Sequence, residues 1–228
     1  MAAKNVVLAH GAWADGSSWA RVITALKSEG ADVVAAPLPL TSLADDVAAL
    51  ERTLARIDGP IVLAGHAYAG AVIAETKSKH VKALVYVTAL APDQGETVAD
   101  VFYRATPHPL APKLAPDDSG LIWLPDAAFA TAFAQHASRE ELAVLSAVQR
   151  PIRPACITVP VGRPRWKDVP SWFLLAEDDR MIVPDTQRFM AERMKAKVRA
   201  HAVDHTPSVT AAAAVVDVIR EVIGSVAG

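Results

Sequence analysis

The sequence predicts an α/β fold, namely a doubly wound, mostly parallel sheet of about six strands with an inserted helical segment. Short runs rich in Val, Ile and Leu alternate with longer segments of helical period, as in strands joined by crossover helices. The runs are continuously apolar, which is typical of strands covered on both faces. A hydrophobic content of 52% provides enough apolar side chain for one large core.

Six short apolar runs qualify as strands because aliphatic and β-branched residues dominate them. They are expected at 5–10, 32–37, 60–66, 81–90, 171–177 and 197–203.

Four longer segments between or after these runs have helical signals. Segment 17–30 begins with a serine cap and ends at Gly30. Segment 42–59 has acids in its first turn, arginines near its end and a stop at Gly59. Further helices are expected at 185–196 and 208–224.

The interval after the fourth strand breaks this alternation. It is rich in proline and has two plausible helices, 126–137 and 138–150, but no strand-helix-strand unit. A structureless loop of this length is uncommon within a compact domain. We therefore expect residues 92–167 to form a helical cap inserted into a core made of residues 1–91 and 168–228.

Composition excludes several classes of protein. The net charge is −2, with 23 basic and 25 acidic residues, so no basic surface for nucleic acid is expected. The beginning of the chain lacks a signal-peptide pattern, and charges or prolines interrupt every run that could span a bilayer. Cys156 is the single cysteine. These features favour a cytoplasmic protein. The expected partner is a small-molecule substrate, and a homodimer is one option for the oligomeric state.

Polar residues follow four of the expected strands, where open parallel sheets bind ligands. They lie in "HGAWADGSSW" (10–19), "GHAYAG" (65–70), "EDDR" (177–180) and "VDHTPS" (203–208). The second segment is similar to the G-x-S-x-G turn that carries a nucleophile, but Ala67 replaces the serine and the second glycine, Gly70, lies one residue later.

This order of motifs resembles the α/β-hydrolase fold. More narrowly, it is similar to short bacterial hydrolases that open with an HGAWADGSSW-type segment and later contain "DRMI" and "RFMAERM". The resemblance covers nearly the whole chain. It implies a nucleophile position at Ala67, an acid at Asp179 and a base at His205. Tyr68 N–H and an amide from Ala12 or Trp13 would form the oxyanion hole.

Other residues compete for these roles or support them. Glu177 and Asp178 neighbour Asp179, and Asp93 is a second candidate for the acid. His10 and His66 are expected to hold backbone groups. The spacing of His80, His108, His136 and His201 indicates no metal site, and no cofactor is expected. An apolar pocket could use Trp13, Tyr68, Phe102 and Trp123 to bind substrate.

Ala67 allows three interpretations. The chain could be an inactivated Ser→Ala variant of an esterase-like enzyme acting on a small carbonyl or ester compound. Alternatively, alanine is native, and His205 with Asp179 acts as a general base in a lyase, an oxygenase or a non-covalent hydrolase. In the third interpretation the protein is a ligand-binding module without catalytic activity.

Overall fold

The computed structural model describes residues 5–226, so the expected core ends 1–4 and 227–228 lie outside the described residues. Six parallel strands form one sheet in the order β2-β1-β3-β4-β5-β6. This confirms the predicted fold class. The strands are β1 (Asn5–Ala9), β2 (Asp32–Ala36), β3 (Ile61–His66), β4 (Val81–Val87), β5 (Ser171–Ala176) and β6 (Lys197–His201).

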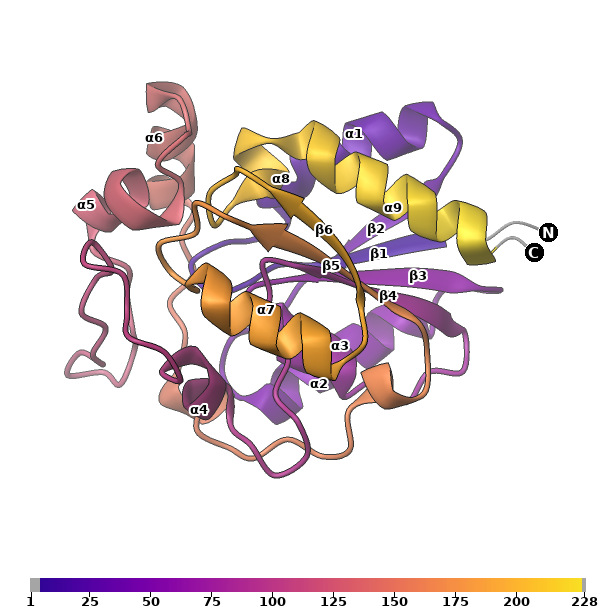
Figure 1. Cartoon of the computed structure of the whole chain (residues 1–228), viewed down its shortest axis with the longest axis horizontal. Coiled ribbons are helices and arrows are strands. Elements are labelled where there is room, and N and C mark those ends of the chain that lie inside the picture. The colour runs from indigo at the N-terminus through magenta and orange to yellow at the C-terminus, as the bar shows by residue number, and fades with distance from the viewer. Residues whose placement is uncertain (1–4, 227–228) are drawn as a thin grey trace.

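Helices cover both faces of the sheet (Figure 1). One face packs against α1 (Ala20–Ser28) and α9 (Ala212–Val226), and the short α8 (Pro207–Thr210) contacts both of these helices. The other face packs against α2 (Leu43–Leu54), α3 (Ala69–Ala74) and α7 (Pro184–Arg193). The interior strands β3 and β5 are buried along their whole length, which explains their mainly apolar sequences.

Several expected boundaries were wrong for local reasons. The fourth strand stops at Val87, not at residue 90, because Thr88 takes a left-handed conformation with φ 45° and turns the chain. A short 3-10 helix, η1 (Gly16–Trp19), precedes α1, and Asp15 provides the cap by accepting from Ser17 N–H. Segment 208–224 is split between α8 and α9 at Ala211, whose φ of −144° and ψ of 46° are not helical.

The interval between β4 and β5 contains only short elements. They are α4 (Val98–Phe102), α5 (Asp126–Ala128), the π-helix η2 (Phe129–Phe133), α6 (Arg139–Ala147), and the 3-10 helices η3 (Pro154–Cys156) and η4 (Arg165–Lys167). The expected helix 126–137 therefore ends early, while α6 begins at a Ser138–Glu141 capping box. Neither α3 nor α4 was among the expected helices.

The segment with α5 and α6 lies beyond one end of the sheet, opposite the two chain ends (Figure 1). Isolated antiparallel bridges join Ile122 to Pro116 and to Ile152, so distant parts of this interval meet. Its buried side chains, including Phe129 and Phe133, belong to the same apolar cluster as α2, α3 and α7. No helix among residues 5–226 is long and apolar enough to cross a bilayer.

Candidate active site

The turn after β3 is strained. Ala67 has a φ of 49°, a left-handed conformation that residues other than glycine rarely adopt. Two glycines allow other backbone segments to pack closely against this turn. A Cβ at Gly65 would lie 2.8 Å from Ala69 O, and a Cβ at Gly70 would lie 2.3 Å from Leu90 O. Leu90 N–H and Gly70 N–H donate to Ala67 O at 2.9 and 3.1 Å. The turn therefore has the geometry of a nucleophile elbow, with a methyl group at its apex.

His205 and Asp179 form a buried pair. The His205 Nδ1 atom lies 2.8 Å from Asp179 Oδ2, and both side chains are almost completely buried. Asp179 Oδ1 accepts from the amides of Met181 and Ile182 at 2.7 and 2.9 Å, and Oδ2 also accepts from Gln187 Nε2 at 2.9 Å. A carboxylate held in this way fixes the His205 tautomer with the proton on Nδ1, so that Nε2 is the basic nitrogen.

Two further side chains bind the backbone of His205. The carbonyl oxygen of His205 lies 2.7 Å from His66 Nε2 and accepts from Thr88 Oγ1 at 2.9 Å. Burial lowers the pKa of His66 to about 3, so His66 is neutral and donates through Nε2–H. The loop with His205 is thus tied to the ends of β3 and β4, beside the elbow.

His10 also binds backbone, as expected. Its Nε2 accepts from Leu38 N–H at 3.1 Å, so Nδ1 carries the proton and donates to Gly11 O at 3.0 Å. Burial lowers the pKa of His10 and favours this neutral form. His10 thereby fixes the turn that contains Ala12 and Trp13.

Two backbone amides near the elbow are free. Among residues 5–226, no acceptor pairs with the N–H of Ala12 or of Tyr68. The amide of Trp13, in contrast, donates to Arg150 O at 3.0 Å. The expectation that Trp13 N–H could bind a substrate oxygen is therefore wrong for this conformation, because a residue before β5 already uses that donor. Within the described residues, the two free amides near the elbow are therefore those of Ala12 and Tyr68.

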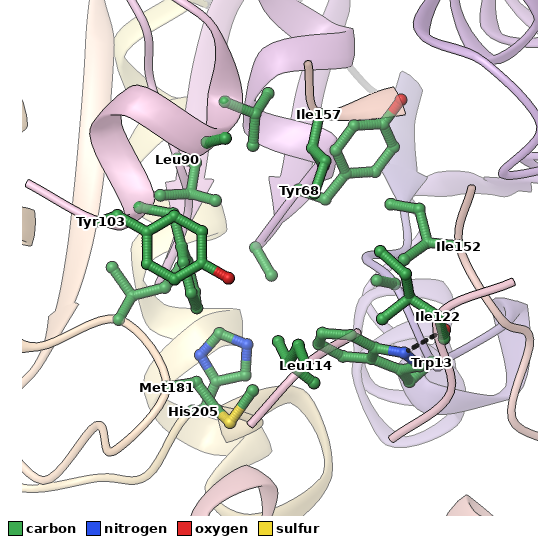
Figure 2. A pocket seen from close by; sticks show the side chains of 16 residues that line it. Trp13, Tyr68, Leu90, Tyr103, Leu114, Ile122, Ile152, Ile157, Met181 and His205 are labelled. Carbon is green, nitrogen blue, oxygen red and sulfur yellow. Dashed lines mark hydrogen bonds between the residues drawn. The ribbon is translucent and has the colours of Figure 1, made fainter. Parts of the chain in front are cut away.

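A cavity of about 80 Å³ lies at this edge of the sheet. Figure 2 shows His205 and Trp13 on one side of it and Tyr68 on the other. Trp13 is fixed by its Nε1–H, which donates to Ile122 O at 2.9 Å. Phe102, Tyr103, Leu114, Ile152, Ile157 and Met181 supply further apolar walls. Apart from His205 the lining is almost wholly apolar, and three of the expected contact residues, Trp13, Tyr68 and Phe102, belong to it.

Other candidates lie away from the cavity. Trp123, the fourth expected contact residue, is 44% exposed, and its Nε1–H donates to Asp117 rather than facing the cavity. Asp93 pairs with Lys167, and Glu177 pairs with Arg188. Asp178 is exposed. Of the four acids considered, only Asp179 contacts His205.

The structure also reveals residues that sequence reasoning missed. Phe133, from the π-helix η2, packs 5.3 Å from the His205 ring and 6.2 Å from Trp13 between ring centroids. Asp46 on α2 is fully buried and accepts from the Tyr68 hydroxyl at 2.7 Å. In the sequence Asp46 was one of two adjacent acids in a helical first turn, and nothing distinguished it from the exposed Asp45. Within the described residues, no group of three or more His, Cys, Asp or Glu could hold a metal ion.

A family model described as the alpha/beta hydrolase family matches residues 6–218. The chain belongs to the alpha/beta hydrolase family. The comparison with curated proteins found no match.

Several solved structures share the fold of this chain at low sequence identity. Polyneuridine aldehyde esterase is 18% identical over 96% of this chain and 98% of its own, with a TM-score of 0.84. The pyrethroid hydrolase PytH with BIF is 20% identical over 98% of both chains, with a TM-score of 0.82. A histidine-to-alanine variant of tomato methylketone synthase I complexed with beta-ketoheptanoate is 18% identical over 99% of both chains, with a TM-score of 0.85.

Proposed function

We propose that this protein is a cofactor-independent enzyme for small, mainly apolar carbonyl or ester compounds, and that it works without a covalent intermediate at position 67. The observation that carries the proposal is the combination of an intact His205–Asp179 pair with two free amides around an elbow that ends in a methyl group. The methyl group of Ala67 cannot attack a carbonyl carbon. The His205–Asp179 pair can still transfer a proton, and the two free amides can still bind an oxygen.

The free amides would bind the oxygen on which negative charge develops. Preorganised backbone donors stabilise an oxyanion or enolate, and they need no particular side chain at position 67. The strained turn at Ala67 would still be needed without serine, because its conformation sets the direction of the Tyr68 N–H. His205 Nε2 would exchange a proton with the substrate or with a water molecule, while Asp179 stabilises the imidazolium form.

The apolar cavity supports a substrate with a polar end and an apolar remainder. A β-keto acid has a ketone and a carboxyl group at one end and an apolar chain at the other, and one structural neighbour was solved with beta-ketoheptanoate. In such a reaction the bond to the carboxylate carbon breaks and CO₂ leaves. The electron pair moves to the ketone oxygen, which the Ala12 and Tyr68 amides would hold as an enolate. His205 Nε2 would first take the carboxyl proton of the β-keto acid and would then return it to the enolate carbon, which completes a methyl ketone, so atoms and charge balance.

A second function is favoured by the elbow geometry and by two structural neighbours, polyneuridine aldehyde esterase and the pyrethroid hydrolase PytH. In it the chain is an Ala67 variant of a serine esterase that would form an acyl-enzyme once serine is present. Loss of a triad serine alone costs on the order of a millionfold in kcat, and the remaining site still gives about 10³–10⁴ over water. A weak esterase activity of the chain as it stands would therefore not separate the two functions.

The test compares the chain with its Ala67→Ser variant on two substrate panels, short p-nitrophenyl esters and β-keto acids of matched chain length. His205→Ala is made in both backgrounds, and His201→Ala is the matched control because His201 lies on β6, away from the cavity. The serine-independent function predicts β-keto acid turnover by the unaltered chain that needs His205 and does not increase with serine. A gain of about a thousandfold or more in esterase activity with serine, dependent on His205, would instead support the esterase. If neither variant turns over either panel but the ligands bind, the protein is a binding module.

A further inference from the structure

Asp46, in the first turn of α2, is a buried acid outside the His205–Asp179 pair. Its side chain is completely inaccessible to solvent. Oδ2 accepts from the Tyr68 hydroxyl at 2.7 Å and is 3.6 Å from Cys156 Sγ. Oδ1 accepts from the backbone N–H of Leu40 at 2.7 Å. Neither the family match nor the proposed chemistry assigns this group a role.

The three donors come from three parts of the fold. Tyr68 follows the elbow residue, Cys156 belongs to η3 in the interval between β4 and β5, and Leu40 lies in the loop after β2. Leu40 is itself left-handed, with a φ of 59°, and its carbonyl accepts from Arg153 N–H at 3.1 Å. One carboxylate thus fastens the elbow to α2 and to the returning end of the inserted segment.

The Tyr68 side chain joins this cluster to the site. Its ring forms part of the cavity wall, and its hydroxyl points away from the cavity toward Asp46 (Figure 2). The backbone N–H of the same residue is one of the two free amides. Because Ala67 is held in a strained conformation, contacts from neighbouring residues must keep the turn in place. The hydrogen bond from Tyr68 to a buried carboxylate is such a contact, and bonds to charged groups are among the stronger ones.

We propose that Asp46 is a positioning residue: it holds Tyr68 by its hydroxyl and thereby fixes the direction of the Tyr68 amide toward the substrate oxygen. The inference rests on the proposed function for the role of that amide, but the positioning itself can be tested without any substrate. Burial raises the pKa of the Tyr68 hydroxyl and raises that of the Cys156 thiol to about 12, so both are neutral donors toward Asp46.

Asp46→Asn is the decisive variant because it conserves shape. An asparagine side chain has one acceptor oxygen, so it cannot accept from both Leu40 N–H and the Tyr68 hydroxyl with the bonds seen here. Asp45→Asn is the matched control, since Asp45 is the preceding residue of the same helical turn and is exposed. Tyr68→Phe removes only the hydroxyl and keeps both the ring and the amide.

Selective nitrogen-15 labelling of tyrosine gives a direct measurement, because the chain has only three tyrosines. The Tyr68 amide signal is assigned by its loss in Tyr68→Phe, and the signals of Tyr86 and Tyr103 serve as internal references. We expect Asp46→Asn to shift the Tyr68 amide signal and to speed its exchange with solvent, while Asp45→Asn leaves all three signals in place. An unchanged Tyr68 signal in folded Asp46→Asn would overturn the inference.

Turnover of the substrate found with the panels above provides the second measurement. Asp46→Asn and Tyr68→Phe should each lower kcat by about tenfold with little change in KM, less than the 10²–10³ lost when an oxyanion donor is removed outright. The double variant should lose no more than either single variant, because both break the same bond. Additive losses would overturn the inference. If no substrate is turned over but the amide shifts, the proposed function fails and the positioning role stands.

Discussion

Replacing Asp179 by asparagine tests the proposed general base with almost no change in side-chain volume. In the structure Asp179 Oδ1 accepts two backbone amides, and Oδ2 accepts His205 Nδ1–H and Gln187 Nε2–H. The amide oxygen of asparagine can retain the two backbone donors, so its NH₂ group then faces His205. Nδ1 must accept in that arrangement, the proton moves to Nε2, and the nitrogen that faces the cavity is no longer a base.

The expected loss in kcat is about 10⁴-fold, by analogy with the same substitution in a Ser-His-Asp triad. Stability should fall much less, by about 1–3 kcal/mol, because one charged hydrogen-bond acceptor is lost. Gln187 keeps a second acceptor in Ile182 O at 2.7 Å. Kinetics on the β-keto acid panel measures the first effect, and urea unfolding measures the second. Histidine nitrogen-15 spectra, read at the His205 ring, report which nitrogen carries the proton.

Asp178→Asn is the control, since Asp178 is the preceding residue and is exposed. The general-base role of His205 is refuted if folded Asp179→Asn keeps its kcat within about threefold while the His205 proton has moved to Nε2. His205 would then not need to accept a proton through Nε2.

Three further variants address other parts of the molecule. Gly70→Ala should lower the free energy of unfolding by about 1–3 kcal/mol because its Cβ would lie 2.3 Å from Leu90 O. Gly224→Ala is the control: open space surrounds Gly224, so this change should be neutral or stabilising by up to about 1 kcal/mol. Urea titrations compare the two variants, and equal effects would contradict the predicted clash at Gly70. Burial lowers the pKa of His66 to about 3, so the free energy of unfolding has its full value above pH 6.5 and falls as the pH drops from there toward 3. His66→Gln should reduce the pH dependence of the free energy of unfolding by the equivalent of one proton, and an unchanged pH dependence would show that His66 does not cause it. Phe102→Ala should raise KM for apolar substrates, whereas Trp123→Ala should leave kinetics unchanged because its indole lies outside the cavity, and a reversed order would mean that the substrate binds elsewhere.

Much of the candidate site could be predicted because each of its parts lies in a short stretch of sequence. The strand runs, the "GHAYAG" turn and the order of acid and histidine each depend on short sequence patterns, and parallel strands bring their carboxyl ends to one edge. Local patterns were less informative where no regular period exists. The helix at 126–137 proved to be a short α-helix followed by a π-helix, and α3 was too short to give a periodic signal.

The sequence by itself determined the fold class and the segments that meet at the candidate site, because hydrophobic periodicity and turn residues act over a few neighbours. Only the tertiary structure decided which of several equivalent groups faces the cavity. Trp13 N–H is occupied because Arg150 O, from a segment far away in sequence, reaches it. Likewise, Asp46 is buried against Tyr68 while Asp45 is exposed, since the packing direction of α2 separates two adjacent acids that are indistinguishable in the sequence.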